Sequence, residues 1–452
     1  MVSLSEFLCS RVNEIKELDA KDREQVQNLI LDFFAALFAG YKLNKKFGDN
    51  VKKIIFEQEG KAEASVFGSN VKLPARSAAF MNALYGHGAE LDDGNKKAMG
   101  HIGVHVIPSV LALAEAEKKN LDEIMIAIVA GYETYIRISA AAQPGMVERS
   151  FHSTGMAGAP ASAVACAKLL GLGKEKIESA MSLACTMSSG LLTYSESQQM
   201  IKPINPAKAA ETGIFAARLA ANGVNGPLNC LDGPNGWFNA VTDSYKKEII
   251  LQDCSHFLIH ECYFKLYPSC RHTHCGIEAA INISSRVDVK NIQRVNVYIY
   301  PNAIKLAGQI RYPKNVDETK FSIHYTLACG LIYGEYSVDY MDPAKRIAEI
   351  KELIDKIELI PDNTMENSEK AIRGALIEVI LYDGSVEREK VLVPKGDPEN
   401  PMKRIDLEHK LKACSEKLIS STQYSELKNY ICNFGGNDII DGKKLFQEIK
   451  NG

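Results

Sequence analysis

Residues that can accept and donate protons are crowded into one short segment, between positions 86 and 105. The segment contains Glu90, Asp92, Asp93, His87, His101 and His105, interleaved with glycines that let the backbone turn. Carboxylates and imidazoles held close together suit general acid–base chemistry. A solvated loop with helix caps is the alternative that this segment alone leaves open.

Four other segments carry groups that could hold a charged substrate or move a proton. They contain His152 (149–155), Lys202 (198–208), Lys265 and Arg271 (264–274), and Tyr325 (321–325). Each has a structural alternative, since His152 could cap a helix and Lys202 could be a solvated surface residue. Together the five segments suit removal of a proton from a carbon beside a carboxylate, with cations holding the substrate's negative charge.

The spacing of these residues argues against several other kinds of site. His101 and His105 are four residues apart, but the glutamate of the zinc-peptidase helix is missing between them. The histidines between Cys270 and Cys275 complete no familiar zinc spacing. The sequence also lacks a dinucleotide-binding glycine motif after a strand, a P-loop and a nucleophile elbow. We therefore expect no metal site, no nucleotide site and no serine-hydrolase chemistry.

Composition indicates an ordinary globular protein of about two domains. The 452 residues are 46% hydrophobic and 24% charged, with a net charge of −3, which gives no general attraction to nucleic acid or anionic membranes. The apolar run 29–41 is too short to span a bilayer, and the first residues lack the pattern of a signal peptide. Eleven cysteines without a C-x-x-C pair favour reduced thiols, and hence a cytoplasmic location.

Hydrophobic periodicity changes along the chain. The first 250 residues predict helices almost throughout, at 21–41, 77–85, 106–115, 121–142, 157–172 and 207–222. Small residues at 155–168 predict close helix packing. After about residue 257, strands are expected at 295–300, 375–382 and 386–393, with helices at 275–285 and 321–331 between them. Helix returns at 406–451, so the helical body is expected to be discontinuous.

The motifs, taken in order, resemble those of the MmgE/PrpD family of 2-methylcitrate dehydratases, cis-aconitate decarboxylases and an iminodisuccinate epimerase. The resemblance covers essentially the whole chain. It rests on HGAELDDG (87–94), GH (100–101) leading into VIPSVLALAE (106–115), GYETYIRI (131–138), FHSTG (151–155), KPINPAKAA (202–210), KLYPSCR (265–271), FSIHY (321–325) and GDPENP (396–401).

The resemblance implies a large all-helical domain built from both chain ends (1–259 and 403–452) and a smaller α+β lid domain (260–402). It also implies an active site in the cleft between the domains, homodimers, and no iron–sulfur cluster or other cofactor. The implied site comprises the catalytic residues Asp92, His101, His152 and Tyr325, with Glu90, Lys202, Lys265 and Arg271 binding substrate. His87 and His105 are expected to have structural roles.

Several positions depart from the family pattern. Gly94 replaces a frequent threonine, Ile102 a frequent proline, and Asn205 and Cys270 stand where histidine is common. The losses at 94 and 270 favour a dehydratase (hydro-lyase) acting on a small hydroxy di- or tricarboxylate. An epimerase of an imino- or amino-dicarboxylate, a cis-aconitate decarboxylase and a non-catalytic carboxylate-binding protein are the alternatives.

The expected mechanism gives each site residue a task. Lys202 and Lys265 bind substrate carboxylates, His101 or His152 removes the proton, and the other histidine or Tyr325 protonates the leaving hydroxyl. Asp92 orients His101 and raises its basicity. The sequence does not assign the acid and base roles between the two histidines.

Overall fold

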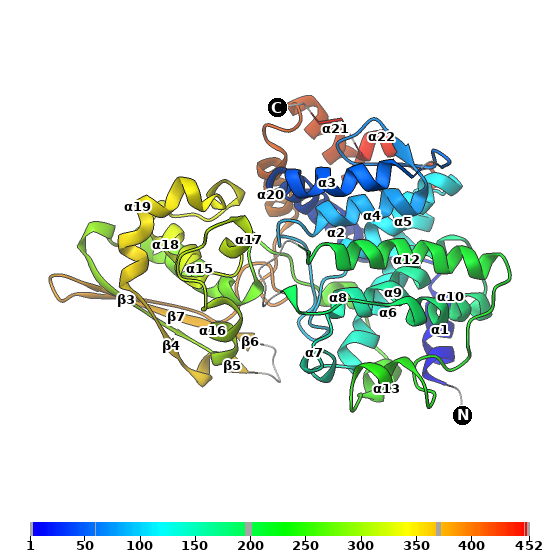
Figure 1. Cartoon of the computed structure of the whole chain (residues 1–452), viewed down its shortest axis with the longest axis horizontal. Coiled ribbons are helices and arrows are strands. Elements are labelled where there is room, and N and C mark those ends of the chain that lie inside the picture. Colours follow the sequence, from blue (N-terminus) through cyan, green and yellow to red (C-terminus); the bar gives the residue numbers. More distant parts are fainter. Residues whose placement is uncertain (1–2, 59, 195–200, 368–371, 447, 450–452) are drawn as a thin grey trace. The chain divides into compact units, whose positions relative to one another are not determined.

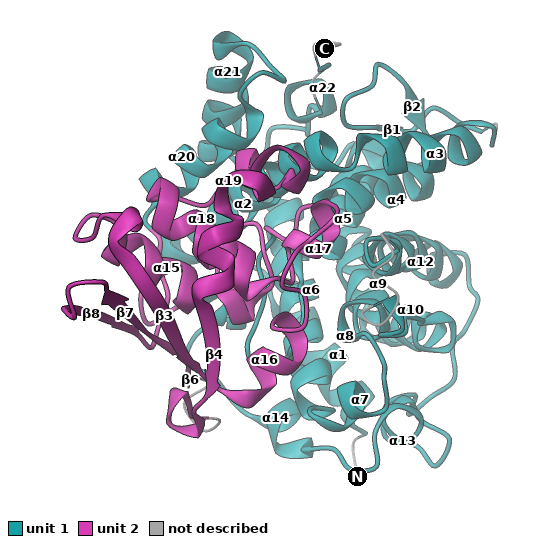
Figure 2. Cartoon of the chain, turned by 60° about the vertical axis from the view of Figure 1, so that its left-hand side comes forward, with its two compact units in different colours: residues 1–88, 92–263, 403–452 teal, residues 89–91, 264–402 magenta. Residues whose placement is uncertain are grey.

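The computed structural model describes residues 3–58, 60–194, 201–367, 372–446 and 448–449. The chain divides into two compact units (Figures 1 and 2). Unit 1 comprises residues 1–88, 92–263 and 403–452, and unit 2 comprises 89–91 and 264–402. The units divide at 263/264 and 402/403. The sequence analysis had predicted domain boundaries at 259/260 and 402/403. The three residues Ala89–Leu91 belong to unit 2, although the chain on both sides of them belongs to unit 1.

Unit 1 is built almost entirely of helices. They are α1 (Leu4–Glu14), α2 (Ala20–Leu43), α3 (Lys45–Phe56), α4 (Ala75–Gly86), α5 (Gly103–Glu117), α6 (Leu121–Ala141), α7 (Gly145–Glu148), α8 (Ser153–Met156), α9 (Gly158–Leu169), α10 (Lys174–Met187), α12 (Ile204–Ala221), α13 (Trp237–Val241), α14 (Lys247–Leu251) and η1 (Leu258–Glu261), followed by α20 (Arg404–Ser415), α21 (Ser421–Cys432) and α22 (Gly442–Leu445). A short hairpin, β1 (Ala64–Ser65) and β2 (Lys72–Leu73), interrupts them.

Helix α9 lies at the centre of unit 1, where it packs against α5, α6, α10 and α12. Its small residues let these helices approach closely. A Cβ added to Gly213 of α12 would lie 2.4 Å from the Ser162 Cβ, so only glycine fits at this crossing. The alanine- and glycine-rich sequence of α9 thus accounts for its central position.

Both ends of the chain contribute to unit 1. Helix α20 packs against α2, and Lys410 of α20 lies 2.5 Å from Asp32 of α2 with both side chains buried. Helices α2 and α6 are long and apolar enough to cross a bilayer by length and composition. In α6, however, 94% of the most apolar window is buried. Such burial is what a core helix requires.

Unit 2 combines helices with a four-stranded mixed sheet of order β4-β3-β7-β8. The strands are β3 (Ile292–Ile299), β4 (Ile357–Pro361), β7 (Ala375–Leu381) and β8 (Val386–Val391), and β5 (Glu366–Asn367) pairs with β6 (Ile372–Arg373) apart from them. The helices are η2 (Arg271–Thr273), α15 (His274–Ser284), η3 (Val289–Asn291), α16 (Pro301–Ala307), α17 (Val316–Thr319), α18 (Ile323–Tyr333), η4 (Val338–Tyr340), α19 (Pro343–Lys356) and η5 (Asn363–Met365).

Helices α15 and α19 pack against the sheet of unit 2, and α18 packs against both of these helices (Figure 1). β3 pairs antiparallel with β7, and β7 forms a hairpin with β8 whose turn places Gly384 at φ +85°. β4 pairs parallel with β3 after a helical crossover, and the sequence did not predict this strand. The predicted fold class, mainly helical with an α+β second domain, is confirmed.

Candidate active site

Asp92 lies between two imidazoles in unit 1. Its Oδ2 atom is 2.9 Å from Nδ1 of His87 and 3.2 Å from Nδ1 of His101. The chain brings the three together because His87 is the C-cap of α4 and His101 precedes α5, with Asp92 in the connection between these helices. The rings of His87 and His101 are 4.8 Å apart.

Asp92 is an anion despite its complete burial. Burial opposes its ionisation, but the charges and hydrogen bonds of His87 and His101 outweigh this and hold the pKa of Asp92 well below its usual range. An ionised carboxylate accepts hydrogen bonds only, so it requires protons on the two facing Nδ1 atoms. The contact between Asp92 and His101 is the one expected from the sequence, and its catalytic role stays a prediction.

Asp93 differs from its neighbour, because it supports the backbone instead of facing the imidazoles. Its carboxyl group accepts hydrogen bonds from the Tyr132 hydroxyl at 2.7 Å and from the Gly103 amide, at the start of α5, at 2.9 Å. Burial, together with the negative charges of Asp32 and Asp92, raises the pKa of Asp93 to about 8. Its backbone carbonyl lies 2.8 Å from Nδ1 of His101, which fixes the ring a second time.

His152 precedes the short helix α8 and is buried, with 5% of its surface exposed. Its amide donates to the Gly190 carbonyl at 3.0 Å, and its Nδ1 atom lies 3.0 Å from Nδ2 of Asn205 on α12. The centre of its ring is 6.3 Å from that of His87 and 5.3 Å from that of Tyr194, which it meets in a T-shaped arrangement. His152 therefore belongs to the same imidazole group as His87 and His101.

Lys202 and the segment that follows His152 tie this group together. The Lys202 ammonium lies 5.9 Å from the centre of the Tyr194 ring, and the His152 ring also contacts this tyrosine. The Thr154 hydroxyl accepts a hydrogen bond from the His101 amide at 3.2 Å. The sequence motifs at 87–101, 151–155 and 202–210 thus meet in unit 1.

The other predicted site residues lie in unit 2. Lys265 donates hydrogen bonds to the Glu90 carbonyl at 2.9 Å and to the Glu90 carboxylate at 3.1 Å, and both side chains are buried. Glu90 has a φ of +53°, in the left-handed region that non-glycine residues rarely adopt. Lys265 and Glu90 were both predicted to bind substrate, but in the structure they form an ion pair with each other.

Arg271 and Tyr325 are also engaged within unit 2. The Arg271 guanidinium contacts the Asp397 carboxylate and lies 2.9 Å from Nδ1 of His274. The Tyr325 hydroxyl donates to the Tyr340 carbonyl at 2.7 Å, and its side chain is fully buried. Burial is the first cause of a strongly raised pKa for Tyr325. These contacts suit structural ties, and the predicted substrate-binding and acid roles stay predictions.

Three motif segments of unit 2 are held together by backbone hydrogen bonds. The Cys270 amide donates to the Lys320 carbonyl at 2.8 Å, and the Phe264 amide donates to the Gly396 carbonyl at the same distance. Gly396 has a φ of +98°, and a Cβ there would lie 2.2 Å from the Phe264 carbonyl oxygen, so only glycine permits this approach. The motifs at 265–271, 321–325 and 396–401 are therefore neighbours.

His87, Asp92 and His101 also offer one possible metal-ligand atom each, all within 4.8 Å of one another. In the structure, Nδ1 of each of these histidines faces Oδ2 of Asp92 in hydrogen-bonding geometry. The Asp93 carbonyl, 2.8 Å from Nδ1 of His101, requires a proton on that nitrogen. The donor set therefore suits a proton-carrying network better than a metal ion.

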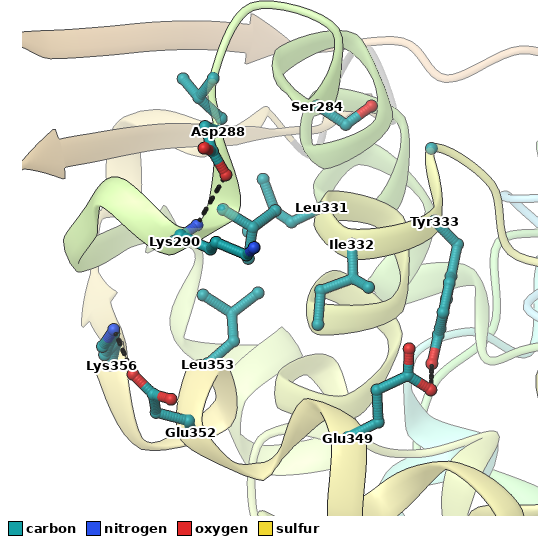
Figure 3. Close-up of a pocket in the computed structure, with 13 residues that line it drawn as sticks. Ser284, Asp288, Lys290, Leu331, Ile332, Tyr333, Glu349, Glu352, Leu353 and Lys356 are labelled. Carbon is teal, nitrogen blue, oxygen red and sulfur yellow. Dashed lines mark hydrogen bonds and ion pairs between the residues drawn. The ribbon is translucent and has the colours of Figure 1, made fainter.

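A separate hollow of about 620 Å³ opens in unit 2 between the ends of α15 and α18 and the side of α19 (Figure 3). Leu331, Ile332 and Leu353 line it. At its rim, Glu349 accepts a hydrogen bond from the Tyr333 hydroxyl, and Lys356 pairs with Glu352. None of the predicted site residues is among the described residues that line this hollow, so we do not assign the reaction to the hollow.

Three residues gain importance from the structure. His87 was expected to have a structural role, but it contacts Asp92 directly. The H-x-x-x-x-D spacing of these two residues is the sequence signal that could have indicated the contact. Asn205 faces His152 and had been noted only as a departure from the family pattern. Tyr194 lies outside every motif, so the sequence contained no signal for it.

Comparison with known proteins shows the family of this chain. The MmgE/PrpD N-terminal domain matches residues 4–250 and the MmgE/PrpD C-terminal domain matches residues 267–431. The chain is 28% identical to the cis-aconitate decarboxylase-like protein oryM of Aspergillus oryzae (94% of this chain, 93% of that protein) and 25% identical to the human cis-aconitate decarboxylase (92% and 89%). It is 23% identical to a 2-methylcitrate dehydratase of Escherichia coli O157:H7 over 45% of this chain and 44% of that protein. The chain belongs to the MmgE/PrpD family of enzymes in both its N-terminal and C-terminal parts.

Proposed function

We propose that this enzyme is a cofactor-independent lyase of a small tricarboxylate, and that it decarboxylates cis-aconitate or a close analogue. The observation that carries the proposal is the buried, ionised Asp92 in contact with His87 and His101. A carboxylate beside an imidazole stabilises its protonated form, which is the proton donor that this reaction needs. Relatives named cis-aconitate decarboxylases match about nine-tenths of the chain.

The proposed reaction requires one proton transfer to carbon. The bond between carbon and the departing carboxylate breaks, and its electron pair forms a new carbon–carbon double bond. The electron pair of the old double bond takes a proton from Nε2 of His101. The products are carbon dioxide and an unsaturated dicarboxylate, and His101 then regains its proton from solvent. Lys202 is the cation we assign to a substrate carboxylate in unit 1.

The missing threonine at position 94 argued for dehydration, but the structure offers a substitute for its hydroxyl group. A Cβ added to Gly94 would lie 2.4 Å from the Tyr263 hydroxyl, so Tyr263 fills the space that a threonine side chain would occupy. The two residues form an isolated antiparallel bridge. This observation, together with the relatives named cis-aconitate decarboxylases, leads us to rank decarboxylation above dehydration, although dehydration was the main expectation from the sequence. Dehydration is the second candidate, because a dehydratase is among the relatives.

A direct assay separates these candidates. The wild-type protein would be incubated in heavy water with cis-aconitate, 2-methylcitrate and an aspartate-derived dicarboxylate, and followed by proton NMR and carbon dioxide release. Decarboxylation predicts carbon dioxide and one deuterium on carbon per turnover. Alkene formation from 2-methylcitrate without carbon dioxide indicates dehydration, and deuterium exchange alone indicates epimerisation. The absence of all three would contradict the lyase proposal.

Variants connect the activity to the site. H101Q should abolish turnover, because it removes the proton donor. The matched control is H256Q, since the His256 side chain is 49% exposed and contacts Ser255, His260 and Glu261, none of which belongs to the predicted site. H256Q should keep wild-type activity. Equal activity of wild type and H101Q would show that the observed turnover arises elsewhere.

A further inference from the structure

Nδ1 of His152 faces a hydrogen-bond donor, whereas Nδ1 of His101 faces acceptors. His152 Nδ1 lies 3.0 Å from Nδ2 of Asn205, and an amide nitrogen only donates hydrogen bonds. Nδ1 of His152 must therefore accept, which places the proton of the neutral ring on Nε2. Protonation of Nδ1 would set two donors against each other, so this contact also disfavours the imidazolium form.

His101 has the opposite arrangement. Its Nδ1 atom faces the Asp93 carbonyl at 2.8 Å and the Asp92 carboxylate at 3.2 Å, and both are acceptors. Nδ1 must therefore carry a proton, so the lone pair of neutral His101 is on Nε2. The Asp92 carboxylate and the Asp93 carbonyl together hold this Nδ1–H, so a transferred proton is exchanged at Nε2.

We infer that Asn205 is a positioning residue that holds His152 neutral with its proton on Nε2, so that His152 serves as a fixed hydrogen-bond donor to the substrate and His101 alone carries the transferred proton. This inference rests on the proposed function and assigns the roles that the sequence left open between the two histidines. A neutral imidazole that polarises an oxygen is an established catalytic device.

The surroundings of His152 agree with a neutral ring. The Tyr194 ring meets it in a T-shaped arrangement, and the ammonium of Lys202 lies 5.9 Å from the centre of the same tyrosine ring. The His152 side chain is also buried, and burial disfavours a positive charge on an imidazole. The carboxylate of the group, Asp92, contacts His87 and His101.

The tautomers can be read by NMR on the full chain labelled with ¹⁵N-histidine. Long-range ¹H–¹⁵N spectra distinguish protonated from unprotonated ring nitrogens, and H101Q and H152Q assign the signals. We expect His152 to be protonated at Nε2 only, and His101 to be protonated at Nδ1. A protonated Nδ1 in His152 would overturn the inference.

A substitution at 205 tests the cause. Asn205→Asp replaces the donor by an acceptor, so His152 should gain a proton on Nδ1 at a pH where the wild-type nitrogen has none. Asn222→Asp is the matched control, because Asn222 is the exposed C-cap of the same helix, and it should leave the His152 signals unchanged. Unchanged His152 signals in folded Asn205→Asp would overturn the inference. If that variant does not fold, the wild-type spectrum still decides.

Turnover gives a second readout. H152Q should lower kcat by roughly 10²–10³-fold, the usual effect of removing one preorganised donor, while its product still gains one deuterium per turnover. H101Q should give no labelled product. The reverse pattern would overturn the inference. Absence of turnover in every variant and in wild type, with the expected NMR pattern, would contradict the proposed function and leave the tautomer assignment intact.

Discussion

The ammonium of Lys265 lies 3.1 Å from Oε2 of Glu90 and donates a second hydrogen bond to the Glu90 backbone carbonyl at 2.9 Å. Both side chains are buried, so the two charges neutralise each other inside unit 2. Glu90 belongs to the three residues that unit 2 takes from the middle of the N-terminal motif. The ion pair is thus one of the contacts that hold this segment in unit 2.

Breaking this pair should be costly. Lys265→Met leaves the Glu90 carboxylate buried without its ammonium, and we expect the free energy of unfolding to fall by about 3–5 kcal/mol. Lys265→Met with Glu90→Met removes both charges and should recover much of that loss. Urea unfolding of the two single variants and the double variant measures the coupling. Additive losses would show that the two charges do not stabilise each other.

Replacement by asparagine should strongly lower the activity at Asp92 and change it little at the adjacent Asp93. Asp92→Asn removes the negative charge that faces both Nδ1 atoms, so kcat/KM should fall by about 10²–10⁴-fold. Asp93→Asn imitates the protonated carboxyl group that a pKa of about 8 implies at neutral pH, and should stay within a few-fold of wild type. Steady-state kinetics at pH 7 on both variants makes the comparison. Equal losses would contradict the distinct roles.

His105 should make the protein sensitive to acid. Burial, with a smaller contribution from the charge of His87, lowers the pKa of His105 to about 3, whereas an unfolded histidine titrates near 6.5. Between these values the unfolded chain binds the extra proton, so stability falls as the pH drops below about 6.5. The loss from pH 7 to pH 5 should be about 2 kcal/mol.

The test of this pH dependence compares slopes, not absolute stabilities. His105→Asn should lose less stability than wild type between pH 7 and pH 5 in urea unfolding, because the titrating group is gone. His256→Gln, at an exposed position, should keep the wild-type slope. An unchanged slope in His105→Asn would assign the acid sensitivity to other groups.

Gly94 and Tyr263 should behave as a coupled pair. Gly94→Thr places a side chain 2.4 Å from the Tyr263 hydroxyl and 2.9 Å from the Gly100 carbonyl, so overpacking should cost about 1–3 kcal/mol. Gly94→Thr with Tyr263→Ala opens space and should be more stable than the sum of the two single variants predicts. Thermal unfolding measures this coupling, and strict additivity would contradict it.

The sequence alone determined the family motifs, the helical first half and most elements of the second. Periodicity predicted α2, α6, α9 and α12, and alternation predicted β3, β7 and β8, because these signals are local. It did not predict β4, which is short, half-exposed and completed only by parallel pairing with β3. It also grouped Asp92 with His101, since both lie within one connection between two helices.

Only the tertiary structure decided how the polar groups are paired. Residues 87 and 92 could each have faced several partners, and Asn205 reaches His152 from 53 positions away. The pairing of Lys265 with Glu90 spans 175 positions, and such contacts depend on packing that no local pattern encodes. The sequence supplied the imidazoles and carboxylates, whereas the fold fixed which nitrogen of each ring faces a donor or an acceptor. That choice determines the chemistry each histidine can perform.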